Sequence, residues 1–205
     1  MEGYTTILHR AKFEYEDRKS VFVGFAAPVS TEADALSFLA DVKKAYPDAN
    51  HHVYAYVLRE NSIMRFSDDR EPQGTAGMPA LDSIRKNKLT NVAVVIIRYF
   101  GGTLLGTGGL VRAYSAAATG ALRAGEIITY DIYASYDIKV SYADYQKIIS
   151  VLEEKGFRSE STKYTDSVVI TGKIKKDAAE ELISSMKEIT SGRIETVFIE
   201  EKFGY

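Results

Sequence analysis

The sequence contains no cysteine and no tryptophan, and it has only four prolines and three histidines among its 205 residues. Without cysteine the chain has no disulfide bond, no thiolate ligand for zinc or an iron–sulfur cluster, and no thiol nucleophile. No hydrophobic run approaches the roughly 20 residues that span a bilayer, because the longest, 92–100, is interrupted by Arg98. The first 20 residues lack the apolar segment of a signal peptide. These absences predict a soluble cytoplasmic protein without a membrane partner.

The chain also lacks an excess of positive charge, since 26 Lys and Arg stand against 28 Asp and Glu. Residues 1–130 hold 15 basic and 14 acidic residues, and residues 131–205 hold 11 and 14. Domains that bind nucleic acid over an extended surface are usually strongly basic. The sequence therefore argues against a basic clamp in either half. A small site made of backbone amides and a few arginines remains compatible with this charge.

Residues 1–130 read as strands alternating with amphipathic helices. Ser30 and Thr31 offer a helix N-cap, and Ala35, Phe38, Leu39, Val42 and Tyr46 follow at helical spacing before Pro47. Residues 92–100 are apolar except for Arg98, which is typical of a strand covered on both faces. The expected strands are 4–15, 21–29, 52–58, 63–66 and 92–100, and the expected helices are 32–46, 78–87 and 110–124.

Residues 136–199 predict a simpler order of elements. Strands are expected over 136–140, 157–164, 167–174 and 194–199, with helices over 142–155 and 177–189. The order βαββαβ is typical of the ferredoxin-like fold. No Pro-rich or Ser-rich linker marks the boundary, which we place at 131–136. The sequence therefore predicts an α+β protein of two domains.

An acidic stretch, Ser67 to Gly77, lies between a predicted strand and a predicted helix. Its carboxylates, Asp68, Asp69 and Glu71, are close enough in sequence to bind Mg²⁺ or to act as acid and base. Together with His52 they are the only catalytic candidates. The same residues also suit a plain turn before a helix N-terminus, and this interpretation is the commoner one. The spacing does not match an EF-hand loop.

A glycine-rich stretch follows the buried strand and leads into a helix. Exposed backbone N–H groups at a helix N-terminus bind phosphate or carboxylate, and two arginines frame the stretch. It is neither a Walker A motif nor a dinucleotide-binding fingerprint. Close packing of backbones is the alternative explanation of the glycines. The candidate anion- or RNA-binding residues are Arg98, Gly101, Gly102, Gly106, Thr107, Gly108, Gly109 and Arg112.

Two adjacent histidines, His51 and His52, begin a predicted strand. Neighbouring side chains of a strand point to opposite faces, so this pair does not bind one metal ion together. Either histidine is most simply a structural residue, and His52 becomes of interest only if the fold brings it to the acidic stretch. With no G-x-S-x-G elbow, a triad hydrolase is unsupported.

The stretch 66–114 resembles the IMPACT/YigZ family of uncharacterised or regulatory proteins. The resemblance rests on Ser67-Asp68-Asp69, Glu71-Pro72 and Gly74 to Gly77, on Val94 to Gly102 and on Leu105 to Tyr114. The order and spacing of these strings match the family, and the His51-His52 strand fits as well. The resemblance extends over the whole chain and is weakest in the second domain. At the position of Arg70 the family often carries glycine.

The resemblance implies more about fold and function. It implies an N-terminal domain, 1–134, of the left-handed βαβ sandwich type shared with a ribosomal protein domain and RNase PH. It implies a ferredoxin-like C-terminal domain, 135–205, similar to the last domain of elongation factor G. Eukaryotic members resemble regulators of translation initiation that act through protein–protein contact in the amino-acid-starvation response. No cofactor, metal or catalytic residue transfers from the family.

Three functions are compatible with these residues. We favour a non-enzymatic regulator associated with translation, the ribosome or RNA, which binds phosphate through the glycine-rich stretch. A metal-assisted phosphoryl-transfer or hydrolytic enzyme would instead use the acidic stretch, provided that both stretches meet in one cleft. A pure protein-interaction module would use the glycines for packing alone. The expected partner is RNA, the ribosome or a translation-regulatory protein, and the sequence leaves the oligomeric state open.

Overall fold

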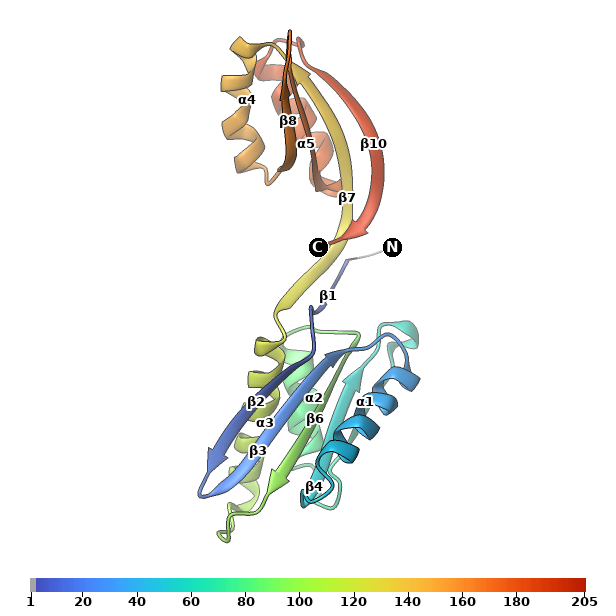
Figure 1. Cartoon of the computed structure of the whole chain (residues 1–205), viewed down its shortest axis with the longest axis vertical. Helices are drawn as coiled ribbons and strands as arrows, with labels where there is room; N and C mark the ends of the chain where they lie inside the picture. Colours follow the sequence, from blue (N-terminus) through green and yellow to red (C-terminus); the bar gives the residue numbers. More distant parts are fainter. Residues whose placement is uncertain (1–2) are drawn as a thin grey trace. The chain divides into compact units, whose positions relative to one another are not determined.

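The computed structural model describes residues 3–205 and separates them into two compact units. The amino-terminal unit comprises Tyr4–Thr129, and the carboxy-terminal unit comprises Tyr130–Tyr205 with Gly3. Each unit combines helices with a sheet (Figure 1). Each unit also has a buried hydrophobic core of its own. The predicted class, α+β with two domains, is confirmed.

The sheet of the amino-terminal unit has the strand order β2-β3-β6-β4-β5, and all of its neighbours are antiparallel. Its centre is β6, whose apolar residues are all buried, as expected for a strand covered on both faces. The strands are β2 (Ala11–Asp17), β3 (Ser20–Pro28), β4 (His51–Val57), β5 (Met64–Ser67) and β6 (Val92–Tyr99).

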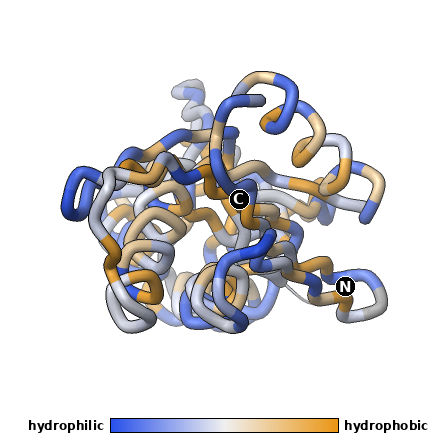
Figure 2. Tube along the Cα trace, turned by 90° about the horizontal axis from the view of Figure 1, so that it is seen from below, coloured by the Kyte–Doolittle hydropathy of each residue, from blue (hydrophilic) through white to orange (hydrophobic). Residues whose placement is uncertain are grey.

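Helices cover both faces of this sheet. The helix α1 (Glu32–Ala45) begins at Thr31 with a reciprocal capping box to Asp34 and packs its apolar stripe on one face. On the other face lie α2 (Gly77–Lys86) and α3 (Gly106–Ala124), which bury small residues against the strands. Figure 2 shows hydrophilic residues on several peripheral turns. The face toward α3 carries the candidate site.

Two predicted elements differ in the structure. The expected strand 4–15 is two strands, β1 (Tyr4–Ile7) and β2, in different sheets. The chain leaves the strand path at Leu8, whose amide bonds to the carbonyl groups of Gly125 and Glu126. The helix expected at 110 begins at Gly106, because burial of Gly109 and Leu110 outweighs the poor helix propensity of glycine.

The carboxy-terminal unit has the predicted βαββαβ order, and its strand order β10-β7-β9-β8 is that of a ferredoxin-like sheet. Both helices pack on one face of the sheet around a shared apolar core. No helix in residues 3–205 combines the length and apolarity needed to cross a bilayer. The elements are β7 (Ile127–Val140), α4 (Tyr142–Glu154), β8 (Arg158–Tyr164), β9 (Val168–Lys175), α5 (Lys176–Ile189) and β10 (Glu195–Gly204).

Candidate functional site

The sheet register places three side chains in one row beneath α3. His51 of β4 lies opposite Arg98 of β6, and Arg98 lies opposite Phe22 of β3. Residues directly opposite in antiparallel strands project from the same face, and here that face is covered by α3. The arginine that interrupts the apolar strand therefore points into the helix-covered core.

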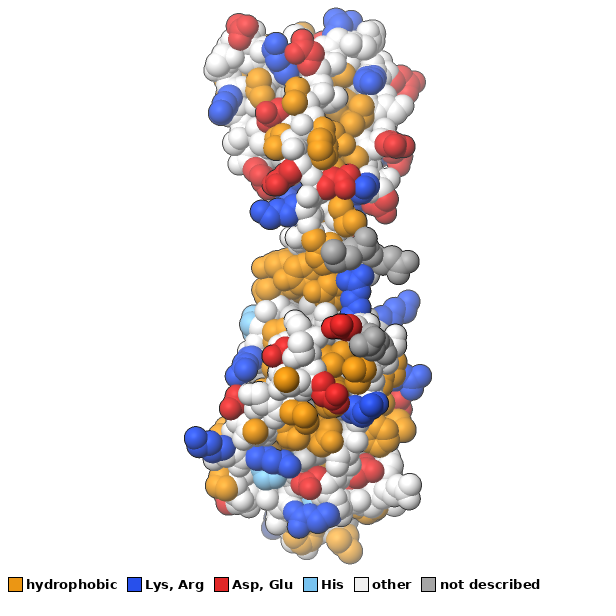
Figure 3. Space-filling model, turned by 90° about the vertical axis from the view of Figure 1, so that its right-hand side faces the viewer, with side chains coloured by type: hydrophobic (Ala, Val, Ile, Leu, Met, Phe, Trp, Pro, Cys, Tyr) orange, Lys and Arg blue, Asp and Glu red, His pale blue; other side chains and the backbone are white. Residues whose placement is uncertain are grey.

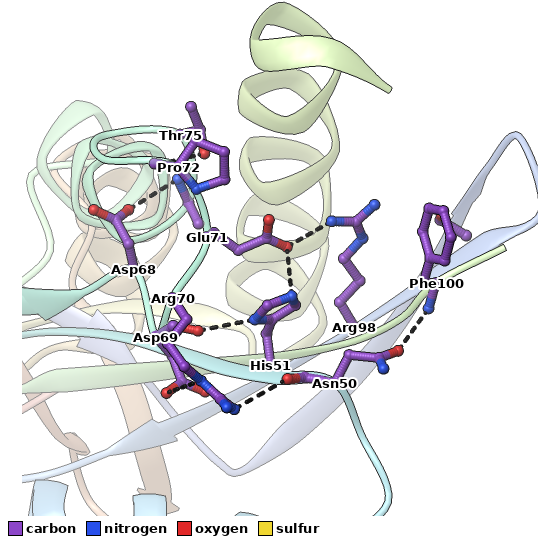
Figure 4. A network of polar contacts seen from close by, with 12 residues as sticks. Asn50, His51, Asp68, Asp69, Arg70, Glu71, Pro72, Thr75, Arg98 and Phe100 are labelled. Atoms are coloured by element: carbon purple, nitrogen blue, oxygen red, sulfur yellow. Dashed lines mark hydrogen bonds and ion pairs between the residues drawn. The ribbon is translucent and has the colours of Figure 1, made fainter. Parts of the chain in front are cut away.

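A buried carboxylate neutralises this arginine. Glu71, from the loop that follows β5, accepts a hydrogen bond through Oε1 from Arg98 Nη1 at 2.7 Å (Figure 4). The same oxygen accepts another from the Tyr114 hydroxyl at 2.7 Å. Glu71 is 8% exposed, Arg98 6% and Tyr114 0%. Burial, reinforced by the Glu71 carboxylate, raises the pKa of the Tyr114 hydroxyl, which therefore stays protonated and donates. Glu71 therefore joins the acidic loop to the sheet through Arg98 and to α3 through Tyr114.

Aromatic rings complete the surroundings of the Arg98 guanidinium. Its central carbon lies 5.4 Å from the Phe22 ring centroid and 5.6 Å from that of Phe100. Phe22 in turn meets Tyr114 edge-on at 5.1 Å. Arg98 Nε is buried without a hydrogen-bond partner, which leaves one desolvated donor in the cluster. Arg98 is thus buried in the interior of the unit, whereas the sequence indicated that it binds an external anion.

The histidine next to the acidic loop is His51. Its Nδ1 donates to the Asp69 carbonyl at 2.8 Å, and its Nε2 lies 3.6 Å from Glu71 Oε1. The His52 ring faces the other side of the sheet and bonds to the Tyr46 carbonyl, as the strand alternation requires. Only the backbone N–H of His52 reaches the Asp69 carboxylate. The fold therefore brings the His51 ring, and not the His52 ring, to the acidic stretch, and only the β4–β6 register identifies His51.

The acidic stretch is a folded loop whose carboxylates have separate partners. Asp68 accepts backbone hydrogen bonds from Gly74, Ala76 and Gly77 at 2.8 to 3.1 Å, whereas Glu71 is turned into the core. Asp69 and Arg70 both adopt positive φ, of 40° and 71°, which explains why glycine suits the position of Arg70. Within residues 3–205 no three His, Cys, Asp or Glu side chains converge as a metal site.

The glycine-rich loop has local structural reasons for most of its glycines. A Cβ on Gly101 would lie 2.0 Å from the Lys19 carbonyl carbon, and a Cβ on Gly109 would lie 2.9 Å from the Leu105 Cβ. Gly102 and Gly106 adopt positive φ, of 82° and 71°. Only Gly108 has neither a positive φ nor a neighbouring atom within 4 Å of the position of a Cβ. Packing and backbone conformation therefore explain all of these glycines except Gly108.

The amino-terminal end of α3 is nevertheless exposed to solvent. Gly106, Thr107 and Gly108 are exposed, and the N-cap residue Leu105 makes no side-chain cap hydrogen bond. The Arg112 side chain folds back along the helix, with Nη2 4.0 Å from the position of a Cβ on Gly109. The first-turn N–H groups of a helix lack partners within the helix, so this end can accept an anion.

The turn between β2 and β3 adds positive charge beside this helix end. Arg18 Nη1 lies 3.5 Å from the Leu104 carbonyl oxygen, and the backbone of Lys19 packs against Gly101. Both side chains are exposed, whereas the sequence indicated them only as part of a charged turn. Basic and acidic side chains intermingle on the face shown in Figure 3. Arg18 and Arg112 therefore each lie beside the start of α3, and the position of Arg18 follows only from the packing of two loops.

Sequence comparison matches residues 18–122 to the Impact N-terminal domain and residues 138–193 to a domain of unknown function, DUF1949. The chain is 31% identical to IMPACT family member YvyE of Bacillus subtilis, over 94% of this chain and 89% of that protein. It is 30% identical to IMPACT family member YigZ of Escherichia coli, over 91% and 93%.

Two further comparisons concern a eukaryotic relative and a solved structure. The rat protein named IMPACT is 34% identical over 44% of this chain and 30% of its own length. The crystal structure of a hypothetical protein, 28% identical, superposes with a TM-score of 0.60 over 98% of this chain and all of that one. With the matches to both domains and to bacterial relatives of similar length, the chain belongs to the IMPACT family.

Proposed function

We propose that this protein is a non-enzymatic, cytoplasmic protein associated with translation, and that it binds the phosphate backbone of RNA at the amino-terminal end of α3. Membership of the IMPACT family supports the association with translation, because eukaryotic members resemble regulators of translation initiation. The observation that carries the proposal is the exposed, uncapped helix end at Gly106, Thr107 and Gly108, flanked by Arg18, Lys19 and Arg112.

The physical argument rests on the first turn of α3. Its N–H groups have no partners within the helix, and the helix dipole favours negative charge at this end. Gly108 offers no Cβ, and nothing lies within 4 Å of the place where one would be, so a phosphate oxygen can approach the backbone closely. Backbone binding of this kind needs little net charge, so it is compatible with a total of −2.

The buried pair of Glu71 and Arg98 supports this surface without taking part in binding. Arg98 lies next to the last residue of β6, shortly before the glycine-rich loop, and its partner Glu71 also accepts the hydrogen bond of Tyr114 of α3. We therefore assign Arg98, Glu71 and Tyr114 a positioning role and assign RNA contact to the helix end. In the same proposal the domains are 1–134 and 135–205, the second similar to the last domain of elongation factor G and adding further contacts.

A substitution at Gly108 tests the proposal. Gly108→Glu places a carboxylate at the first turn, where the helix dipole favours it, so the fold is retained while a phosphate is repelled. Gly108→Ala is the matched control, because its methyl group meets open space. Fluorescence anisotropy with a labelled single-stranded RNA should show loss of binding for Gly108→Glu and near-normal binding for Gly108→Ala.

Salt dependence supplies a second readout. If Arg18, Lys19 and Arg112 each neutralise one phosphate, the slope of log K against log salt is about −2 for single-stranded RNA. RNA affinity that is equal in wild type and Gly108→Glu would refute the proposal. Co-sedimentation with ribosomes that persists in Gly108→Glu would point instead to a protein contact.

A further inference from the structure

The carboxy-terminal unit contains a cavity that the proposed function does not use. Its volume is about 430 Å³, within the range of roughly 300 to 1,000 Å³ found for small-molecule sites. It lies where the end of α4 and the start of β8 meet the end of β9 and the start of α5. All of its lining residues belong to this one unit.

Three basic side chains from separate elements line the cavity, and no carboxylate is among the lining residues. They are Lys155, Arg158 and Lys175. Lys155 and Lys175 each pair with one carboxylate outside the lining, Glu181 and Asp131. An ammonium group has three donors, so each lysine retains donors for a ligand. The cavity therefore favours an anion.

Arg158 supplies the charge that is not neutralised. Its guanidinium lies 5.2 Å from the centroid of the Tyr133 ring, and within residues 3–205 it forms no ion pair. The residue is exposed, so its planar fork of donors is accessible from the cavity. Such a fork binds the paired oxygens of a phosphate or carboxylate bidentately.

The rest of the lining is mostly apolar. Phe157 is 6% exposed and Ile174 1%, and Ala178 completes the surface together with Tyr133. Phe157 and Ile174 already pack in the hydrophobic core and present only small edges to the cavity. A flat ring attached to the anionic group would cover these edges together with Tyr133 and Ala178, since apolar surface gains free energy when it is removed from water.

From these observations we propose that the cavity binds an organic phosphate of mononucleotide size, with its phosphate on Arg158 and the two lysines and its ring on the apolar lining. A phosphate monoester carries about 1.5 to 2 negative charges at pH 7, which suits three surrounding cations better than a single carboxylate does. This site is independent of the helix end proposed for RNA.

Isothermal titration calorimetry on the full chain tests the proposal with AMP, adenosine and inorganic phosphate as the three probes. AMP should bind at one site per chain, and adenosine and inorganic phosphate should each bind at least about tenfold more weakly. Arg158→Gln should weaken AMP binding about tenfold, since it removes a charge-assisted pair of hydrogen bonds. Lys163→Gln, an exposed lysine of the same strand outside the cavity, is the matched control and should bind AMP normally.

Chemical shifts locate the site independently of any variant. On addition of AMP, the backbone amides of Gly156 and Ala178 should shift, whereas that of Gly108 should not. Gly108→Glu should leave AMP binding unchanged, which separates this proposal from the one on RNA. The proposal is overturned if AMP fails to bind at about 1 mM. Equal binding of inorganic phosphate and AMP, or equal effects of Arg158→Gln and Lys163→Gln, would overturn it as well.

Discussion

Replacing Glu71 by glutamine should destabilise the amino-terminal unit strongly, although the two side chains have nearly the same shape. In the native protein Glu71 is the carboxylate partner of Arg98, and both are more than nine-tenths buried. Glu71→Gln leaves the Arg98 guanidinium buried without a counter-charge. The same change weakens the hydrogen bond from Tyr114, because the acceptor is no longer charged.

The expected magnitude follows from the contacts of Glu71. Removal of one partner of a buried ion pair costs about 3 to 5 kcal/mol, because the remaining charge stays desolvated. Arg98 Nε already lacks a hydrogen-bond partner, so the guanidinium has little to compensate the loss. Glu16→Gln is the matched control: Glu16 is exposed on β2 of the same sheet, and its replacement should change stability by less than about 0.5 kcal/mol.

Native-state hydrogen exchange of the β6 amides is the appropriate assay. It reports the opening of the amino-terminal unit alone, whereas tyrosine fluorescence would mix both units because the chain lacks tryptophan. The double variant Glu71→Gln with Arg98→Met should be less destabilised than the two single costs added together, because it buries no lone charge. A cost below about 1 kcal/mol for Glu71→Gln would refute the reasoning that this pair stabilises the loop and α3.

Three further predictions concern single positions. Gly101→Ala should lower the free energy of unfolding by at least about 2 kcal/mol, because the new methyl group meets the Lys19 backbone. Gly108→Ala should raise it by up to about 1 kcal/mol, because alanine is the better helix former and its methyl group meets open space. Urea titration of the two variants measures both changes. Arg70→Gly should stabilise by about 0.5 to 1 kcal/mol, since φ is 71° at that residue, and an unchanged urea midpoint would contradict this explanation. Two hydrogen bonds from Arg193 hold the pKa of the Asp144 carboxyl well below its usual range. This pair therefore stabilises the carboxy-terminal unit above about pH 4, and the stabilisation is lost as the pH falls. Asp144→Asn should therefore flatten the acid limb of a pH–stability curve, and an acid limb as steep as in wild type would exclude that pair as its cause.

Much of the architecture was predictable because it depends on local patterns. The capping residue Thr31 and the apolar spacing after it were sufficient to place α1, and the βαββαβ order of the second domain followed from alternating periods of 2 and 3.6 residues. The strings around Glu71 and Gly108 were sufficient to indicate the family. Such signals lie within short stretches of chain, so one sequence contains them in full.

The site itself was decided by tertiary structure. Glu71, Arg98 and Tyr114 are far apart in the sequence, and only the packing of a loop and a helix on the sheet joins them. The same holds for His51, which the strand register places beside Glu71, and for Arg18, which packing places beside Leu104. Residue types and spacing identify which groups can carry charge. Which of them are buried, paired or open depends on long-range contacts, because desolvation and partner geometry are properties of the folded chain.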